Sequence, residues 1–448
     1  MFSIKIEDII LFPVYVAVFY YLIKLNRKKL SDPLLKIYLT RGFMVKILAC
    51  IAFTVFNTYL SPGDSIGVYY PEGVNLYQLI LKDPSNLDKL FFTPASNIDF
   101  NFLSEPTNSA IFVSENNYMV VRITALFSFL SFGSYMVTNL FFAMLSFAGM
   151  WRLFKFFYAL YPTLHKEMAI AILYFPTVVF WSSGVFKDPI CIAGIGFITY
   201  SLYKIVYARE SILSNSIIIL IFGYLLINLK IYILISYLPC LILFLVLKNI
   251  ALIKNAILKI LIGPAIFILV IIGVISVIDN YKMELGMYAA DDVVETIKRQ
   301  QTTFAQQEDY ATSNFNLGVE FDGTLPGLIK IIPFAITATL FRPFIWESKK
   351  MSTLLSSLES LAIMLFTLFV FFKSGFLGFF RTIIRDSGAL FSFSFAMIFG
   401  LFVGASTLNF GSLVRYKIPC LPFYLIALFI VLDVAKQKKK KALIIAAD

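Results

Sequence analysis

Residues 217–247 read IIILIFGYLLINLKIYILISYLPCLILFLVL and carry one charged side chain, that of Lys230. Lys230 separates two apolar runs, 213–229 and 231–247. Each run approaches the length of about 20 residues that a helix needs to cross the hydrocarbon core of a bilayer. A helix that is apolar on every face is stable only in a large protein core or in lipid. This stretch therefore predicts two membrane-spanning helices.

The composition of the whole chain supports a membrane location. Of 448 residues, 59% are hydrophobic and 15% are charged, and the mean hydropathy is +0.82. Soluble domains are about 45–50% apolar and about 25% charged, so this composition excludes a soluble globular protein. The formal charge of +11 indicates cytoplasmic anchoring of membrane helices rather than nucleic-acid binding.

Other runs extend the same pattern along the chain. Runs of spanning length lie at 8–25, 43–60, 168–186, 189–207, 257–278, 352–372, 387–406 and 417–434. The stretch 118–151 is longer than one span needs. We expect it to cross once, with two crossings hinged at Gly133–Ser134 as the alternative. The stretch 326–343 is broken by Pro333 and Pro343, and we expect it to be re-entrant or interfacial. The predicted fold is an all-α, polytopic transmembrane helical bundle of about 11–13 membrane segments.

Two long polar segments divide the chain into five regions. They are N-terminal transmembrane helices (1–60), a first extracytoplasmic loop (61–117), a transmembrane core (118–278), a second extracytoplasmic loop with the re-entrant or interfacial helix (279–351), and C-terminal transmembrane helices with a basic tail (352–448). Long connections between packed elements are usually functional, so the two loops are where chemistry is expected.

Basic residues in short loops orient this map. The cytoplasmic side should hold Lys24, Arg27, Lys28, Lys29, Lys36 and Arg41, and also the tail lysines Lys436, Lys438, Lys439, Lys440 and Lys441. The N-terminus and the segment 61–117 then face the extracytoplasmic side.

Candidate chemistry is confined to a few polar groups at the membrane boundary. The chain has one histidine, His165, on the expected cytoplasmic side, so catalysis would use carboxylates, Lys, Arg or Tyr. The turn SPGDSIGVYY (61–70) places Asp64 just beyond the second helix, with Glu72 behind it. A partly buried carboxylate at this position can act as a general base. A solvated aspartate in an ordinary turn is the alternative reading.

Three further sites place cations on the face that should be poor in them. They are Lys187 in WSSGVFKDP (181–189), Arg342 in RPFIWE (342–347), and the pair Arg415 and Lys417 in GSLVRYKIP (411–419). A lipid phosphate or pyrophosphate is the natural anion at that depth, and outer-leaflet head groups are the alternative. Asp188 and Pro189 suit the N-cap and the first turn of the next helix.

This pattern resembles the GT-C glycosyltransferases, the integral membrane enzymes that use polyprenyl-phosphate-linked sugars. The segments FWSSGVFKD (180–188), LFRPFIWE (340–347) and LVRYKIPCLPF (413–423) look like parts of membrane proteins of this type from bacterial polysaccharide gene clusters. The resemblance implies inverting glycosyl transfer at the extracytoplasmic face. Asp64 would be the general base, with Glu72 as the nearest candidate for a second acidic residue. Arg415, Lys417, Arg342 and Lys187 would bind the donor phosphate.

The resemblance also sets expectations for partners and location. It implies a polyprenyl-phosphate-linked sugar as donor, a glycan or lipid as acceptor, and the bacterial inner membrane as location. No cofactor is required and no metal site is expected, although Asp64 with another loop carboxylate could hold a divalent cation weakly. The alternatives are a polysaccharide polymerase or ligase that acts on polyprenyl-pyrophosphate glycans, a transporter of lipid-linked sugars, and a non-catalytic membrane subunit. The polymerase reading would use loop arginines such as Arg122 and Arg299.

Overall fold

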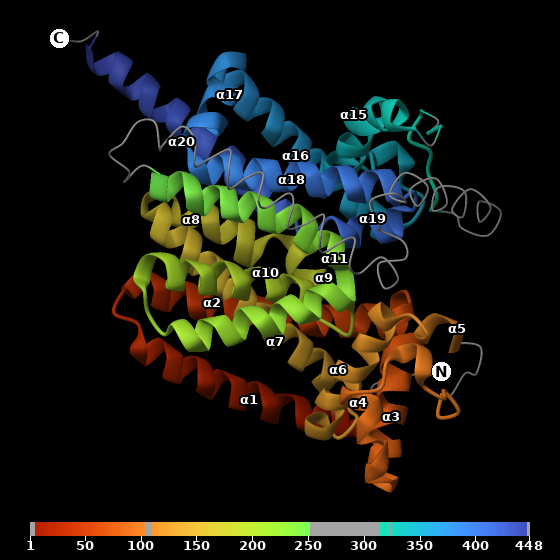
Figure 1. Ribbon diagram of the computed structural model, residues 1–448. Helices are drawn as coiled ribbons and strands as arrows, with labels where there is room; N and C mark the ends of the chain where they lie inside the picture. The colour runs from red at the N-terminus through yellow and green to blue at the C-terminus, as the bar shows by residue number, and fades with distance from the viewer. Residues whose placement is uncertain (1–4, 104–108, 251–312, 320, 323, 446–448) are drawn as a thin grey trace. The chain divides into compact units, whose positions relative to one another are not determined.

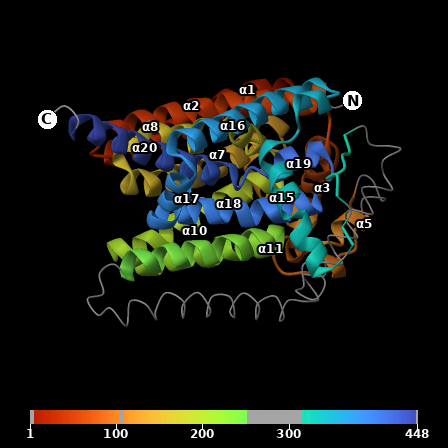
Figure 2. The same cartoon turned by 90° about the horizontal axis from the view of Figure 1, so that it is seen from above.

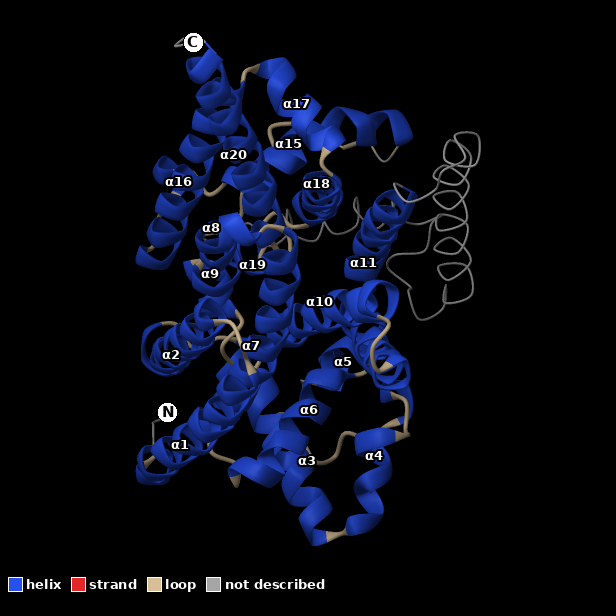
Figure 3. Cartoon of the chain, turned by 90° about the vertical axis from the view of Figure 1, so that its left-hand side faces the viewer, coloured by secondary structure: helices blue, strands red, loops and turns tan. Residues whose placement is uncertain are grey.

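The protein is an all-helical membrane protein. The computed structural model describes residues 5–103, 109–250, 313–319, 321–322 and 324–445 (Figure 1). Within these residues every regular element is a helix (Figure 3). The one β contact among them is an isolated bridge between Asn314 and Asn409. Seven described helices are long and apolar enough to cross a membrane, or eight if one bent pair is counted. The predicted polytopic helical bundle is confirmed. The predicted span 257–278, residues 279–312 of the second loop and Arg299 lie outside the described residues.

The chain forms two compact units. Unit 1 comprises Met1–Pro162 and Met168–Lys230, and unit 2 comprises Thr163–Glu167 and Ile231–Asp448. The long helix α11 (Ile212–Ile250) departs from helical geometry at Lys230, where φ is −154° and ψ is 74°. The one charged residue of the apolar stretch therefore separates the two runs that the sequence predicts.

Helix α7 organises the membrane part of unit 1. The other long helices of this unit are α1 (Ile6–Lys29), α2 (Pro33–Val55), α10 (Lys187–Tyr203) and the first part of α11, and α7 itself is Tyr135–Leu160. Helix α7 packs most extensively on α10 and also contacts α2 and α1. Its closest approach to α10 is between glycines, because a Cβ on Gly196 would lie 2.0 Å from the carbonyl oxygen of Gly149. Small residues at such crossings let membrane helices pack closely.

The stretch 118–151 contains one helix of spanning length. Helix α6 (Glu115–Ser131) ends at Phe132 and Gly133, both with positive φ (55° and 72°), and α7 begins after them. Of these two helices only α7 is long and apolar enough to cross a membrane. The break between the two helices falls where the two-crossing alternative places its hinge, and the single crossing stays a prediction.

The first long polar segment is a helical lobe. It contains α3 (Tyr70–Lys82), α4 (Leu87–Phe91) and α5 (Ser109–Phe112), which pack with α6. Helices α3 and α6 are in close contact, since a Cβ on Gly73 would lie 2.4 Å from Cγ2 of Thr124. We call residues 61–131 the lobe. The sequence predicts this segment as a loop because short amphipathic helices lack the long apolar runs that mark spans.

Residues 168–186, predicted as one span, do not form one continuous helix. They contain the end of α8 (His165–Ala169), a π-helical turn (Ile170–Tyr174) and the short helix α9 (Pro176–Trp181). The break falls at Phe175, whose φ of −67° and ψ of 119° are extended. A residue before proline avoids the helical region, so Pro176 explains the interruption.

The two ends of unit 1 differ in charge. The start of α1 lies at the lobe end (Figure 2). There Tyr15 donates to the carbonyl of Leu130, and Ser134 donates to Asp8. At the opposite end Tyr158 of α7 donates to Asp32, in the connection between α1 and α2. That connection is flanked by the basic residues Lys24, Arg27, Lys28, Lys29 and Lys36. The positive-inside rule predicts that the basic end faces the cytoplasm and the lobe faces the opposite side.

Unit 2 contains the C-terminal helices. They are α15 (Leu325–Phe341), α16 (Met351–Ser374), α17 (Phe376–Arg385), α18 (Ser387–Ser406), α19 (Phe410–Tyr416) and α20 (Leu421–Ile445). Helix α15 is shorter than a span and packs against α18, where a Cβ on Gly404 would lie 1.9 Å from the carbonyl oxygen of Ala335. The predicted span 417–434 begins at a 61° bend between α19 and α20. Lys417 lies in that bend.

Candidate functional site

Asp64 lies in a turn between two π-helical segments. The segment η1 (Phe56–Leu60) ends α2, and η2 (Ser65–Tyr69) leads into α3. Asp64 is exposed and occupies the N-cap position of η2, but its side chain makes no cap hydrogen bond. Its carboxylate is therefore not used to cap the helix. Such π-helical segments are rare and occur frequently at functional sites.

The segment after Asp64 is held by buried polar contacts. The hydroxyl groups of Ser65 and Tyr135 lie 2.9 Å apart, which ties η2 to α7. Tyr69 donates to Oδ1 of Asn117 at 2.9 Å, which ties the other end of η2 to α6. Asp64 is thus an exposed carboxylate on a fixed backbone, which is what a positioned general base requires.

Glu72 lies in a different environment from Asp64. It is in the first turn of α3 and is fully buried, and it accepts a hydrogen bond from Nδ2 of Asn75 at 2.9 Å. Its neighbour Gly73 packs directly against α6. The two predicted carboxylates therefore share one segment of the chain but not one surface. A catalytic role for Glu72 stays a prediction, and in this conformation its side chain supports the packing of α3 on α6.

Two tyrosines of the lobe, Tyr70 and Tyr118, are unsuited to act as bases. Burial raises the pKa of the Tyr70 phenol, and the negative charge of Asp8 raises it further. Tyr70 donates to the carbonyl of Gly133 at 2.6 Å. Burial likewise raises the pKa of Tyr118. Both phenols therefore remain protonated near neutral pH, and the carboxylates remain the better candidates for proton acceptors in the lobe.

Lys46, a residue of α2, holds the polar segment 181–186 in place. The ammonium group of Lys46 donates to the carbonyl of Ser182 at 2.8 Å, to its hydroxyl at 2.6 Å, and to the carbonyl of Val179 at 3.2 Å. Lys46 is 1% exposed. These carbonyls lie at the end of helix α9, where a cation opposes the negative end of the helix dipole, and the hydroxyls of Ser183 and Ser146 donate to them as well. Lys46 is not among the functional residues predicted from the sequence. A lone lysine within the apolar run 43–60 is nevertheless a feature that could identify it.

Asn139 and Gly184 fix the rest of this break. Oδ1 of Asn139 accepts from the backbone N–H of Val185 at 2.9 Å, and its Nδ2 donates to Thr54 at 3.0 Å. A Cβ on Gly184 would lie 1.9 Å from the ring of Phe53, so only glycine fits there. The break is thus a rigid internal turn that sets where α10 begins.

Lys187 and the η2 segment both contact the first turn of α6. Its ammonium group donates to Oδ1 of Asn116 at 2.9 Å, next to the Asn117 that holds Tyr69. The rings of Phe186 and Tyr69 are in edge contact, with centroids 6.4 Å apart. Within unit 1 the structure therefore links Lys187 and the segment that carries Asp64 through neighbouring residues of α6.

Asp188 does not cap α10 as the sequence predicts. Helix α10 begins at Lys187, with Phe186 at the N-cap position and no side-chain cap bond. That prediction is wrong because a closer partner is present: Oδ1 of Asp188 lies 2.7 Å from Nζ of Lys230, and both side chains are buried. A buried carboxylate is stable only when it is paired or protonated, and Lys230 supplies the opposite charge. Pro189 does lie in the first turn of α10, as predicted.

Unit 2 brings two of its three predicted cations, Arg342 and Lys417, into contact. The guanidinium of Arg342 lies over the rings of Phe315 (4.2 Å) and Phe410 (5.4 Å), pairs with Glu347, and donates to the carbonyl of Asn316 at 2.8 Å. Arg342 is therefore held in place by protein groups.

Lys417 contacts Arg342, and Arg415 is two residues before Lys417 in the chain. Lys417 is 1% exposed and donates to the carbonyl of Arg342 and to the hydroxyl of Ser360, each at 3.0 Å. Its charge also interacts with Glu359. Arg415 is half-buried in the last turn of α19, two residues before Lys417. A role of these three cations in phosphate binding stays a prediction.

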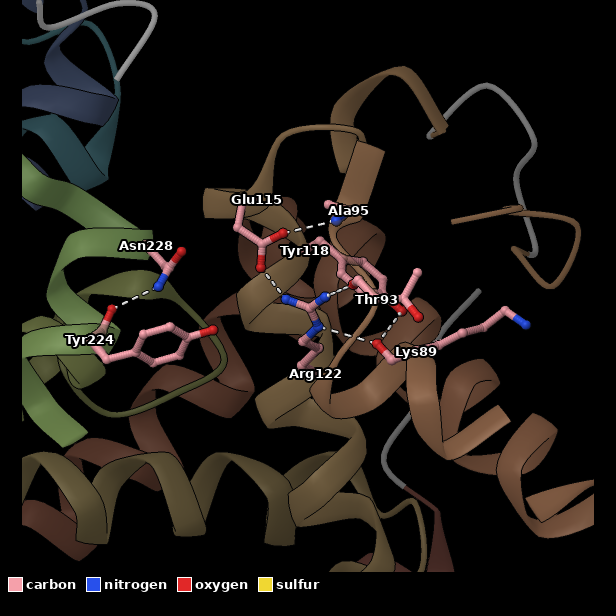
Figure 4. A network of polar contacts seen from close by, with 8 residues as sticks. All are labelled: Lys89, Thr93, Ala95, Glu115, Tyr118, Arg122, Tyr224 and Asn228. Carbon is pink, nitrogen blue, oxygen red and sulfur yellow. Dashed lines mark hydrogen bonds and ion pairs between the residues drawn. The ribbon is translucent and has the colours of Figure 1, made fainter. Parts of the chain in front are cut away.

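Arg122, the arginine that a polymerase reading would use, is part of the internal structure of the lobe. It pairs with Glu115 and donates to the carbonyls of Thr93 and Lys89, the latter at 3.2 Å (Figure 4). The guanidinium also lies 4.6 Å from the centre of the Tyr118 ring. Arg122 thus connects α6 to the segment around α4, and its side chain is only 7% exposed.

Neither a metal centre nor a related protein defines the site further. The described residues contain no group of three or more His, Cys, Asp or Glu side chains that could hold a metal ion. Comparison with protein-family models, with curated proteins and with solved structures finds no match to this chain. The candidate site is therefore defined by the side chains described above.

Proposed function

We propose that the protein is a membrane glycosyltransferase that moves a sugar from a polyprenyl-phosphate donor to an acceptor hydroxyl at the extracytoplasmic face of the bacterial inner membrane. The observation that carries this proposal is the position of Asp64. It is an exposed carboxylate at the lobe end of a spanning helix, on a backbone fixed by Ser65 and Tyr69, with Lys187 bound to the adjoining part of α6.

The proposed reaction needs few protein groups. Asp64 accepts the proton of the acceptor hydroxyl as its oxygen attacks the anomeric carbon of the donor sugar. The bond from that carbon to the phosphate oxygen breaks on the opposite face, and the phosphate leaves with the bonding electrons, so the configuration inverts. A cation such as Lys187 stabilises the negative charge that develops on the phosphate.

The charge distribution of unit 1 supports the proposed orientation. The lobe and the start of α1 lie at one end, and the lysine-rich connection between α1 and α2 lies at the other. Lipid-linked sugars present their phosphate at the membrane surface, which is the depth expected for Asp64 at the end of α2. A soluble nucleotide-sugar donor would instead be expected at the cytoplasmic end.

Replacement of Asp64 tests the base assignment. The full-length protein would be reconstituted in liposomes with a panel of polyprenyl-phosphate-linked hexoses carrying radiolabelled sugars, together with lipid-linked and soluble glycans as acceptors. We expect Asp64→Asn to lower the rate of transfer by about 10²–10⁴-fold, the usual contribution of a general base. Asp99→Asn, another exposed lobe aspartate, is the matched control and should retain the wild-type rate. Unchanged transfer by Asp64→Asn would remove the base assignment.

A further inference from the structure

Unit 1 contains a cavity at its basic end, away from the lobe. The cavity has a volume of about 300 Å³ and lies between α1, α2 and α7. Its walls are mainly apolar and include Phe19 and Leu22 of α1, Leu39 of α2, and Phe147 of α7. This volume is at the lower end of those found for small-molecule sites, so the cavity is large enough for part of a flexible apolar molecule.

Two cations of α7 line the same cavity. Arg152 and Lys155 are three residues apart and therefore lie on one face of the helix. The guanidinium of Arg152 lies 3.9 Å from the centre of the Phe197 ring, and the ammonium of Lys155 lies 4.1 Å from the centre of the Tyr200 ring. These rings of α10 hold the two cations in place without neutralising their charge.

The positive charge at this place exceeds the negative charge. Lys204 is near enough to interact with Lys155, and its ammonium lies 5.8 Å from the centre of the Tyr200 ring. Lys204 itself pairs with Glu210 at 2.6 Å. Among the described residues, neither Arg152 nor Lys155 forms a salt bridge with a carboxylate. In the part of the chain that the structure describes, Glu210 is thus the one acidic partner of these three cations, and it pairs with Lys204. An added anion would relieve the mutual repulsion of the cations.

The depth of these cations matches a lipid head group. Helix α7 has 26 residues and is about 39 Å long, whereas the hydrocarbon core is about 30 Å thick. If Tyr135 marks the boundary at the lobe end, the opposite boundary falls about 20 residues later, close to Lys155. Basic pockets between membrane helices at this level bind lipid phosphates.

We propose that this cavity binds an anionic glycerophospholipid of the cytoplasmic leaflet. An acyl chain lies against Phe19, Leu22 and Phe147, and the phosphate is bound by Arg152 and Lys155. The apolar walls favour a lipid over a free anion, because a free phosphate would leave those walls in contact with water. This inference is independent of the proposed glycosyl transfer, because it concerns the end of unit 1 that is opposite the lobe.

Lipid titration of the full-length protein tests the proposal. The delipidated protein in detergent would be titrated with phosphatidylglycerol and with phosphatidylcholine of identical acyl chains, and binding would be followed by native mass spectrometry. We expect phosphatidylglycerol to bind at least about 10-fold more tightly, since each basic residue near a membrane surface contributes about a few-fold to binding of an anionic lipid. Arg152→Gln combined with Lys155→Gln should abolish this preference.

Matched variants separate the cavity from the general basic character of this end. Lys28→Gln combined with Lys29→Gln removes two exposed charges from α1 and should keep the preference. Ala148→Leu, which fills the cavity wall and leaves both cations in place, should weaken binding of both lipids. Melting temperatures of all variants check folding, and Ala148→Leu still tests the site if the charge variant does not fold.

Three results would overturn the proposal. The first is equal affinity of the wild-type protein for the two lipids. The second is an unchanged preference when Arg152 and Lys155 are both replaced, or unchanged lipid affinity in Ala148→Leu. The third is displacement of phosphatidylglycerol by inorganic phosphate, which would identify a site for free anions rather than for lipid.

Discussion

Asp188 and Lys230 form an ion pair in the interior of unit 1, with 2.7 Å between Oδ1 and Nζ and with side chains only 1% and 6% exposed. The pair joins the first turn of α10 to the residue at which α11 leaves helical geometry. Ionisable residues at membrane depth are costly and are retained for specific reasons. Here the pair fixes the position of the non-helical residue of α11 relative to the start of α10.

Single replacements should therefore cost more than a double replacement. We expect Asp188→Leu or Lys230→Met alone to destabilise the protein by about 3–5 kcal/mol, because each leaves a buried charge without its partner. The double variant should recover much of this loss, since no buried charge remains. Thermal unfolding of the four proteins in one detergent gives the coupling between the two positions. Additive losses would show that the two charges do not depend on each other.

The sequence predicts the membrane helices more reliably than their interruptions. The runs 8–25, 352–372 and 387–406 each form a single helix, since each is apolar over most of its length and is not interrupted. The run 168–186 is interrupted at Phe175, before Pro176. The proline after Phe175 indicates this interruption locally. Hydropathy averaged over a window of residues does not reveal it.

The candidate site shows the same limit at the level of side chains. The exposed turn at Asp64 could be predicted because proline and glycine mark it locally. The pairing of Asp188 with Lys230, 42 residues later, depends on how α10 and α11 pack. The bonds of Lys46 to Ser182 span 136 residues. A single sequence identifies such polar residues as unusual, but it does not identify their partners.

Lys46 should be essential for the stability of the turn before α10. Replacing it with alanine removes the charged donor from the buried carbonyls of Val179 and Ser182, which keep the hydroxyl donors Ser183 and Ser146. We expect a loss of about 1–3 kcal/mol in the free energy of unfolding, the scale of lost hydrogen bonds to a charged group. Arg41→Ala removes an exposed cation from the same helix and should change stability little. Thermal unfolding in detergent compares the two variants. Equal stability of Lys46→Ala and the wild type would contradict this role.

Arg122 should hold the segment around α4 against α6. In Arg122→Ala the carbonyls of Lys89 and Thr93 each lose the bond from the guanidinium and Glu115 loses its salt bridge, whereas Tyr118 still donates to Lys89 and the N–H of Ala95 to Glu115. We therefore expect local opening to become easier by about 1–3 kcal/mol. Hydrogen exchange of residues 87–97 should accelerate, while exchange in α7 should not change. Lys82→Ala, an exposed lobe cation, is the control. Unaltered exchange at 87–97 would argue against the connection.

Lys187 should affect the donor more than the acceptor if the proposed function is right. Lys187→Ala should lower kcat/KM for the lipid-linked donor by roughly 100-fold, the scale of one lost contact to a developing negative charge. Asn116→Ala removes the residue that orients Lys187 and should give a smaller loss of the same kind. Assays with varied donor and fixed acceptor, and the reverse, separate these effects. A change confined to the KM of the acceptor would assign Lys187 to the other substrate.

Labelling of single cysteines tests the orientation that every functional argument uses. The four native cysteines are buried, so background reaction with a membrane-impermeant thiol reagent should be low. In intact cells we expect Ser85→Cys, an exposed position in the lobe, to be labelled. Lys28→Cys, exposed at the basic end, should react only after the membrane is permeabilised. The opposite pattern would place Asp64 on the cytoplasmic side, where a donor from the outer leaflet could not reach it, and the basic-end cavity in the outer leaflet.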